Sequence, residues 1–544
     1  MSRRAIAVAL SLVLVPIVAA PADSPQTPQI RISTRLVEVD VIVRDKNGPV
    51  SNLNKNDFTV LDRGKRQQIS VFSVDFAPSI PQAAQPLPPN SFSDLPRYGT
   101  STPRSVTIVL LDNLNTLYGS APGAIESTPR WVEDLALQNA RAHLIQFIRT
   151  LDSRDRVAIY GLRDSLHILC DFTSDRAQLL AVLKNYDTRS ITNRETVEPG
   201  SMHPPVLGHA ADGFENGAAA FRAGSANETR ARITIAALQS IAAHVANIPG
   251  RKNLVWLTAN LPFSDAAMAR VLTPANIAVY PVDARGLLTT TVPTRPGEGT
   301  FTLGMGPGAI TDNTAPAQSS QPIGIPAMQQ LADETGGQAF VNTNDITGAI
   351  RKAVEDSAVT YTLGFYINRD ALDGKFHEVK VEVRGKGLTV RYPKGYFAYP
   401  DTSPTKDEDQ MRLLSAVQSP LQSSVIPLQA SLSRVNEPKP NSLSLSCSID
   451  VHNLRLVQSG HLRKGTVIVY MIEQDQTGKV VYQWDRGYNL QINDGTQYAA
   501  LLKSGMLFHQ YLQPKAGVTT LRLLVEDSNT SQFGSLIIPL SQVK

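Results

Sequence analysis

The sequence predicts an α/β module, with a doubly wound, mostly parallel sheet and helices on both faces, flanked by all-β modules. The run from Ser105 to Thr116 is the first indication, because β-branched residues and Leu continue without polar alternation up to Asp112. A strand that is apolar on both faces is typical of a parallel sheet buried between helices. Similar runs then alternate with amphipathic helices as far as Asn368. From residue 413 onward only strand patterns recur, which indicates a separate β domain.

The first 22 residues have the pattern of a secretory signal peptide. Arg3 and Arg4 precede an apolar stretch, residues 5–19, and Ala20-Pro21-Ala22 supplies the small residues of a cleavage site. The apolar stretch is too short for a membrane span, and no later stretch reaches the roughly 20 apolar residues that a span needs. We expect residues 1–22 to be removed. The mature chain is then expected to be secreted, periplasmic or at the cell surface, with no integral membrane segment.

Composition argues against nucleic acid as a partner. The 544 residues include 52 Lys and Arg and 48 Asp and Glu, for a formal net charge of +4. So small an excess gives no electrostatic reason to expect binding to nucleic acid or to an anionic membrane. The two cysteines, Cys170 and Cys447, lie in distant segments. We expect two separate buried thiols rather than a disulfide.

The N-terminal module, residues 23–77, has a β pattern. Apolar strand runs are separated by turn sequences at Asp45–Gly48 and Asp62–Lys65. Residues 78–104 are rich in Pro, Ser and Gln and contain few apolar residues, so we expect an extended linker there.

The α/β module is predicted to span residues 105–368. Helix periodicity is present at 131–151, 175–186, 228–248, 326–335 and 345–357. Apolar runs of strand length occur at 106–112, 157–160, 166–170, 253–258, 277–283, 339–341 and 361–367. Two long loops, 187–227 and 285–325, are rich in Gly, Pro, Thr, Ser and Ala. Loops of this length are either functional or disordered.

After the α/β module the sequence returns to strand patterns. Residues 369–400 form a predicted hairpin around the turn Gly385-Lys386-Gly387. We suspect that segments 30–77 and 375–398 pair into one β unit from which the α/β module projects. Residues 401–412 have the composition of a charged, polar linker. The short strands and turns of residues 413–544 predict a β-sandwich of immunoglobulin or fibronectin type.

Several segments of the middle module resemble the von Willebrand factor type A fold. They are the strand that ends at Asp112, the long helix at 131–151, and the runs at 156–159, 250–258 and 331–340. With the stretches at 45–58, 375–377 and 393–397, the layout resembles a family of exported bacterial proteins, typical of acidobacteria, described as related to that domain. The resemblance covers nearly all of the mature chain. It implies a fold and carries little known function.

The resemblance implies a metal-ion-dependent adhesion site after the first strand, where the fold usually carries D-x-S-x-S. This sequence reads Asp112-Asn113-Leu114-Asn115-Thr116, so the acid and the last hydroxyl match, whereas Leu114 has no ligand atom. Hard cations prefer carboxylate, hydroxyl and carbonyl oxygens. Asp112, Asn115 and Thr116 are therefore the candidate ligands for Mg²⁺ or Mn²⁺. The alternative is that Asp112 and Asn115 hydrogen-bond the loop backbone and cap the segment that follows.

The other positions that the resemblance implies match less well. At the later acid position the sequence reads Thr258-Ala259-Asn260, so a neutral amide stands where the carboxylate would be. The loop threonine has no assigned counterpart, and Thr188 and Thr192 are candidates by location only. A set with a single carboxylate binds Mg²⁺ weakly.

We predict a non-enzymatic protein that binds a protein partner, in adhesion or in the assembly of a complex. The binding face would lie at the carboxyl ends of the strands and would include Asp112, Asn113, Thr258 and Asn260. One alternative is a scaffold of the periplasm or cell surface that binds through residues 413–544. The other is a hydrolase with a dispersed Ser-His-Asp site, although the motifs G-x-S-x-G, H-E-x-x-H, G-x-x-x-x-G-K-[ST] and C-x-x-C are absent from the sequence.

Overall fold

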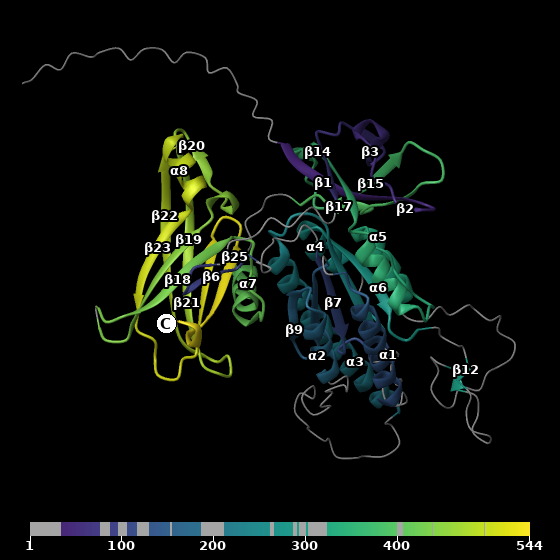
Figure 1. Cartoon of the computed structure of the whole chain (residues 1–544), viewed down its shortest axis with the longest axis horizontal. Helices are drawn as coiled ribbons and strands as arrows, with labels where there is room; N and C mark the ends of the chain where they lie inside the picture. Colours follow the sequence, from purple (N-terminus) through teal and green to yellow (C-terminus); the bar gives the residue numbers. More distant parts are fainter. Residues whose placement is uncertain are drawn as a thin grey trace, which may run out of the picture.

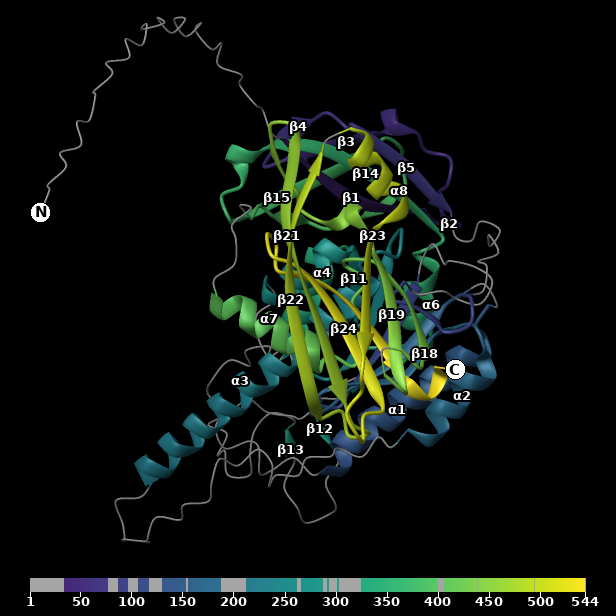
Figure 2. The same ribbon diagram turned by 90° about the vertical axis from the view of Figure 1, so that its left-hand side faces the viewer.

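The computed structural model describes residues 34–76, 87–95, 106–116, 130–152, 155–186, 212–261, 266–286, 291–292, 301–302, 324–399, 406–437, 439–493 and 495–543. Three units follow from its sheets: a central α/β module, a β unit and a C-terminal sandwich (Figures 1 and 2). The predicted signal peptide, Thr188, Thr192 and most of both long loops lie outside the described residues. No helix in the described part of the chain is long and apolar enough to cross a membrane.

The α/β module is built on a five-stranded sheet in the order β11-β10-β7-β8-β9. β7, β8, β10 and β11 are parallel, and β9 is an antiparallel edge strand that pairs with β8. The strands are β7 (Val106–Asp112), β8 (Val157–Leu162), β9 (Leu166–Thr173), β10 (Lys252–Thr258) and β11 (Ile277–Asp283). The chain starts at β7, adds β8 and β9 on one side, and then adds β10 and β11 on the other. The strand order therefore reverses at β7.

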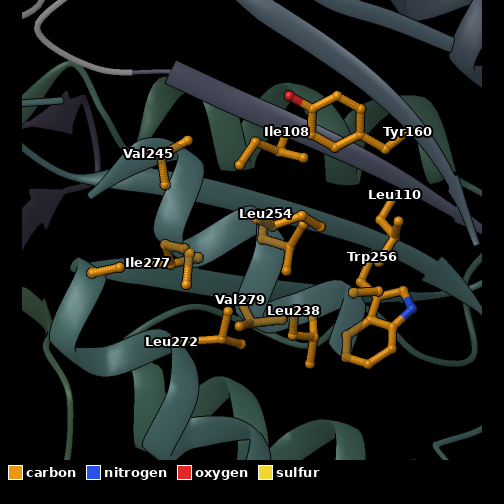
Figure 3. Packing of buried hydrophobic residues seen from close by; sticks show 14 of the residues in the cluster. Ile108, Leu110, Tyr160, Leu238, Val245, Leu254, Trp256, Leu272, Ile277 and Val279 are labelled. Carbon is orange, nitrogen blue, oxygen red and sulfur yellow. The ribbon is translucent and has the colours of Figure 1, made fainter. Parts of the chain in front are cut away.

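Helices cover both faces of this sheet, because successive side chains of a strand point to opposite sides. Ile108 and Leu110 face one core, and Val109 and Leu111 face the other. One face is covered by α1 (Arg130–Arg149), α2 (Arg176–Asn185) and α6 (Ile346–Glu355). The other is covered by α3 (Asp212–Val245), α4 (Ala266–Leu272) and α5 (Ile325–Thr335), and Figure 3 shows part of this packing.

Two local predictions for this module are wrong. The segment 187–227 is predicted to be a loop, but α3 already begins at Asp212. Residues 339–341 are predicted to form a strand, but Phe340 makes only an isolated parallel bridge to Val282. Before that bridge the chain passes β11 very closely at Gly337, where a Cβ atom would overlap the carbonyl oxygen of Val279. Only glycine permits this approach. Within the second long loop, two short strands pair, β12 (Thr291–Val292) and β13 (Phe301–Thr302).

The β unit combines the N-terminal segment with the residues that follow α6. One sheet has the order β16-β1-β14-β5, with β2 paired to β1, and the other has the order β17-β15-β3-β4. Side chains of both sheets share one apolar core. The suspected pairing of the two flanking segments is confirmed by β1 with β16 and by β3 with β15. The strands are β1 (Thr34–Asp45), β2 (Gly48–Pro49), β3 (Phe58–Asp62), β4 (Lys65–Gln67), β5 (Val71–Phe76), β14 (Val359–Asn368), β15 (Phe376–Val383), β16 (Thr389–Arg391) and β17 (Gly395–Phe397).

β14 does not belong to the unit that its sequence predicts. Residues 361–367 are predicted to be the last strand of the α/β module, yet β14 pairs antiparallel with β1 and β5. Tyr361, Leu363 and Phe365 are buried in the core of the β unit. The α/β module therefore ends with α6, before β14, and not at residue 368.

A buried carboxylate joins the β unit to the α/β module. Asp356, directly after α6, is fully buried, and its oxygens lie 2.9 Å from a nitrogen of Arg44 and 2.5 Å from a nitrogen of Arg391. Both arginines belong to the β unit. The Tyr280 hydroxyl of β11 donates to the same carboxylate (3.1 Å), and the Arg251 guanidinium donates to that hydroxyl (3.2 Å). Because the carboxylate binds groups of both units, it fixes their relative position.

The C-terminal domain is a sandwich of two antiparallel sheets around one apolar core. One sheet has the order β23-β19-β18-β6, and the other has the order β20-β21-β24-β25, with β22 paired to β21. The strands that follow residue 412 are β18 (Leu428–Val435), β19 (Ser442–Ile449), β20 (Val457–Ser459), β21 (Leu462–Gln474), β22 (Val480–Asn493), β23 (Met506–Leu512), β24 (Thr520–Asp527) and β25 (Gln532–Pro539). Two helices occur where none is predicted, α7 (Lys406–Gln418) and α8 (Thr496–Ser504). α7 begins inside the predicted linker 401–412, so that linker is in part helical.

The predicted linker 78–104 contributes a strand to this sandwich. β6 (Ser91–Ser93) pairs antiparallel with β18. Directly after β6, both oxygens of the buried Asp94 accept from the Leu428 amide, at 2.9 and 3.0 Å. Burial raises the pKa of Asp94 well above its usual range. The sandwich thus contains a segment that lies more than 300 residues earlier in the chain, which composition alone does not reveal.

We expect Asp94→Ala to release β6 from the sandwich. The substitution leaves the buried amide of Leu428 without its acceptor, and such a group costs about 1–3 kcal/mol. Hydrogen exchange at the amides of residues 428–431 should accelerate by the corresponding factor. Ser91→Ala, in β6 itself and only half-buried, is the matched control. Equal exchange rates in the two variants would show that Asp94 does not hold β6.

The two cysteines are separate buried thiols, as predicted. Cys170 on β9 and Cys447 on β19 are both free and buried. Burial raises the pKa of Cys447 to about 12, so its thiol stays protonated and unreactive at neutral pH.

Candidate functional site

Asp112 lies at the carboxyl end of β7, where the strand order of the central sheet reverses. β8 pairs with β7 on one side and β10 on the other. In open α/β sheets, ligands bind in the crevice outside the carboxyl ends of the strands at such a reversal. The loops after β7, β8, β10 and β11 all begin at this edge, because the four strands are parallel. We call it the switch-point edge.

The Asp112 carboxylate is fully buried and surrounded by donors. The indole nitrogen of Trp256 on β10 donates to Oδ2 (2.8 Å), and the backbone amide of Asn115 donates to Oδ1 (2.9 Å). The side-chain amide of Asn115 donates to Oδ2 (3.0 Å), and the Thr258 hydroxyl lies close to the same carboxylate. In Figure 3 the indole nitrogen of Trp256 points away from Leu238 and the rest of the labelled core. The carboxylate therefore organises the loop after its own strand.

Asn115 ties this loop to α3. Its Nδ2 also donates to the Thr234 hydroxyl (3.0 Å), and the Thr116 hydroxyl donates to the carbonyl oxygen of Asp112. Asn115, Thr116 and Thr234 are all buried. The loop is closed onto β7 and onto α3, which is the hydrogen-bonded alternative to a metal site.

Asn113 lies on the face of the sheet that α2 covers, opposite to the face that α3 covers. Its Oδ1 accepts from the Tyr186 hydroxyl (2.7 Å), directly after α2. The Arg163 guanidinium, just beyond β8, lies 5.3 Å from the centre of the Tyr186 ring. Burial raises the pKa of Tyr186, so its hydroxyl keeps the proton that it donates. Arg163 itself is half-buried and remains accessible at the switch-point edge.

The loops after β10 and β11 are closed locally. The Thr258 hydroxyl donates to the carbonyl oxygen of Asn260 (2.7 Å), and Asn260 Oδ1 accepts from the Leu261 amide (2.9 Å). Asn260 therefore uses its side-chain oxygen within its own turn. Asp283, at the end of β11, is bound by two nitrogens of Arg285 at 2.8 and 2.7 Å. Its charge is neutralised inside the loop.

The structure brings together some of the predicted site residues and separates others. Asp112, Asn115, Thr116 and Thr258 form one hydrogen-bonded group, whereas Asn113 faces α2 and Asn260 caps its own turn. All of them except Asn260 are buried.

Sequence reasoning misses three partners of these residues. Trp256 lies in a continuous apolar run, and this pattern predicts that its indole is part of the apolar core. Thr234 and Tyr186 fall in or next to helix patterns, and nothing in those patterns marks them as partners of a strand end. Only the polar nitrogen of a buried Trp, which usually needs an acceptor, could have signalled the contact with Asp112.

The residues at Asp112 do not fit Mg²⁺ or Mn²⁺. Three N–H groups already donate to the two carboxylate oxygens, and the residues around them supply no second carboxylate. Within the described residues, no group of three or more His, Cys, Asp or Glu side chains could hold a metal. Asn115 Oδ1 is the one side-chain oxygen of this group that has no hydrogen-bond partner in the described part of the chain. The hydrogen-bonded alternative is therefore the one we adopt for Asp112, Asn115 and Thr116, and titration with these ions tests it.

Burial also sets the charge balance at this edge. Burial raises the pKa of Asp112, and the hydrogen bonds from Asn115, Trp256 and Thr258 oppose the rise. Burial lowers the pKa of Arg230 on α3, and the charge of Asp112 opposes this lowering.

The chain was compared with known protein families, curated sequences and solved structures. No family model matches it, and no curated protein sequence matches it. Among solved structures, it is similar to an aerotolerance-related membrane protein from Bacteroides fragilis, with 14% identity, 47% of this chain and 98% of the other covered, and a TM-score of 0.26. It is also similar to a von Willebrand factor type A protein from Catenulispora acidiphila, with 9% identity, 65% of this chain and 81% of the other covered, and a TM-score of 0.23. A third similar structure is the pilus adhesin SpaC from Lactobacillus rhamnosus GG, with 8% identity, 89% of this chain and 58% of the other covered, and a TM-score of 0.21. Similarities with TM-scores this low carry no argument about fold or function.

Proposed function

We propose that this chain is an exported, non-enzymatic protein that binds a protein partner at the switch-point edge of a von Willebrand factor type A-like module. The observation that supports it most directly is the position of the Asp112 network at the reversal of a doubly wound sheet. The motifs that resemble that fold lie in the same module. The role we propose for this edge is adhesion or the assembly of a complex.

The buried network supports the edge, and the half-buried residues around it supply the contacts. Leu114, Arg163 and Asn260 are half-buried and surround the closed group at Asp112. Their loops are held by hydrogen bonds to strand ends, so a partner meets a pre-organised surface and little order has to be gained on binding. Arg163, fixed over Tyr186, offers the polar contact.

A hydrolase remains the less favoured alternative. Asp164 and Ser165 lie in the exposed turn after β8 and His167 lies in β9, but Ser165 and Asp164 both contact Nε2 of His167, at 3.3 and 2.9 Å. A Ser-His-Asp triad needs the serine and the acid on different ring nitrogens. We expect a fluorophosphonate probe to leave the chain unlabelled. Stoichiometric labelling of a serine would refute the non-enzymatic proposal.

Binding through the sandwich is the second candidate, and removing residues 405–544 cannot test it cleanly. The Ser424 hydroxyl donates to the His244 carbonyl of α3 (2.9 Å), and β6 belongs to the sandwich, so the deletion would also disturb the rest of the chain. Site-specific photo-crosslinking in the source cells avoids this problem. A benzophenone amino acid would replace Arg163 at the switch-point edge, Leu507 on the sandwich, or the exposed Lys386 of the β unit as control.

We expect a discrete protein adduct from the Arg163 position and none from the Lys386 position. An adduct from the Leu507 position alone would show that the partner binds the sandwich and not the switch-point edge. Adducts from neither Arg163 nor Leu507 would contradict protein binding at both surfaces.

A further inference from the structure

The sandwich has two free sheet edges next to each other. Among the described residues, β22 pairs only with β21, and β23 pairs only with β19, so each is the last strand of its sheet. An edge strand presents unpaired N–H and C=O groups to which another strand can be added. β22 is 14 residues long, which makes a long edge. Figure 2 shows both strands in front, on the side of the sandwich turned away from the α/β module.

A groove of about 310 Å³ lies between these two edges. Tyr488 and Leu490 of β22 and Met506 and Phe508 of β23 line it with side chains that also pack against the core. All of these except Phe508 are only half-buried. The rings of Tyr488 and Phe508 meet edge to face, with 5.8 Å between their centres. The core of the sandwich is therefore partly open along this side.

Large exposed apolar side chains concentrate on the same two strands. Five of the ten such side chains in the described residues belong to β22 or β23: Val480, Val481, Tyr482, Leu507 and Tyr511. Leu507 lines the groove and is 78% exposed. Proteins usually protect a free edge with charges, proline or a covering segment, and clustered exposed apolar side chains mark interaction sites.

The opposite side of the sandwich shows what covers an edge of this domain. There β6, a segment distant in sequence, pairs with β18 as the last strand of its sheet. Asp94 then fixes that segment through the Leu428 amide. An added extended segment thus extends a sheet on one side of the sandwich. The groove beside β22 lies at the corresponding position on the other side of the sandwich.

Arg486 determines the chemistry that fits the groove. It stands opposite the buried Val469 in the pairing of β21 with β22, so it lies on the core-facing side of β22. Its guanidinium lines the groove, 5.7 Å from the centre of the Tyr488 ring. Every other residue that lines the groove is uncharged, so a carboxylate is the complement that a partner would supply.

We propose that β22 accepts an extended segment of another protein as an added strand. Alternate apolar side chains of that segment enter the groove between β22 and β23, and one Asp or Glu among them pairs with Arg486. Backbone hydrogen bonds supply the affinity in this mode of recognition, and the side-chain positions supply the specificity. This inference does not depend on binding at the switch-point edge.

The first test is selection from a phage-displayed library of random nine-residue peptides on the full chain. We expect the enriched sequences to carry apolar residues at every second position. One of these alternate positions should carry Asp or Glu instead. Synthetic peptides of these sequences should bind the full chain in fluorescence anisotropy. Failure to enrich any sequence, or enrichment of sequences without the alternation, would overturn the proposal.

N-methylation separates strand addition from other ways of binding. Two versions of the best peptide would be made, one methylated on the odd-numbered and one on the even-numbered amides. Only one of these sets faces β22 in an added strand, so one version should lose at least about tenfold in affinity while the other keeps it. Equal affinities of the two versions would contradict strand addition.

The charge reversal Arg486→Glu tests the side-chain contact. It should weaken binding of the acidic peptide by about tenfold or more, and a peptide with Lys in place of the acid should restore binding to the variant. Lys439→Glu, an exposed charge reversal in the turn between β18 and β19, is the matched control and should have no effect. Unchanged affinity in Arg486→Glu would refute the contact. A dimer of this chain that Arg486→Glu dissociates would assign the edge to a second copy and overturn the proposal.

Discussion

The Asp356→Ala variant is expected to lose about 3–5 kcal/mol of unfolding free energy, because it leaves buried cations without their counter-ion. Arg44 and Arg391 reach Asp356 from the β unit with only 20% and 17% of their side chains exposed. Arg251, itself buried, depends on the same carboxylate through Tyr280. Guanidinium groups cannot lose their proton to escape the penalty. Urea unfolding of the full chain, followed by tryptophan fluorescence, measures the loss.

Glu355→Ala is the matched control for this substitution. Glu355 is adjacent in sequence, half-exposed, and 3.5 Å from the same Arg44, so its removal should cost less than about 1 kcal/mol. Hydrogen exchange in β1 and β16 should accelerate in Asp356→Ala only, because the β unit loses its attachment there. Similar unfolding midpoints for the two variants would show that Asp356 does not join the units.

The second large effect is expected for Asp112→Ala, which should cost about 3 kcal/mol or more. The substitution leaves the Trp256 indole and both N–H groups of Asn115 buried without their acceptor, and each such group costs about 1–3 kcal/mol. The emission of Trp256 should shift as its hydrogen bond is lost. Asp164→Ala removes an exposed acid beyond the end of the neighbouring strand β8, and we expect it to change stability by less than about 0.5 kcal/mol. Equal stability of the two variants would contradict the network.

The loss of unfolding free energy in Asp112→Ala should also depend on pH. Burial raises the folded-state pKa of Asp112 above its unfolded value. For such a group the stabilisation by the protonated form is fully present below the unfolded pKa and is lost as the pH rises through the folded pKa. The stability difference between the wild type and the variant should therefore shrink as the pH rises through the pKa of Asp112. A difference that grows with pH would mean that the hydrogen bonds outweigh burial.

Sequence patterns reveal the central sheet well because its strands are buried on both faces. Ile108–Leu111 and Leu254–Leu257 are apolar without polar alternation, as expected for strands that are buried on both faces. β14 is misplaced because Tyr361, Leu363 and Phe365 would suit either core. Its assignment depends on pairing with β1, over 300 residues away, which local patterns do not encode.

The candidate site is predictable only in part, for a similar reason. Asp112, Asn115 and Thr116 are close in sequence, so their grouping around one strand end follows from the strand itself. Trp256 and Thr234 complete the group from other elements. Their contribution decides whether the carboxylate faces donors or a cation, and the sequence motif alone cannot decide it.

The most direct test of the account is calorimetric titration of the purified mature chain with Mg²⁺ and Mn²⁺. If Asp112 organises a closed, cation-independent edge for protein binding, neither ion should give saturable heat, and Asp112→Asn should titrate in the same way. Saturable micromolar binding that Asp112→Asn abolishes would contradict it and would make the site at Asp112 a working metal site.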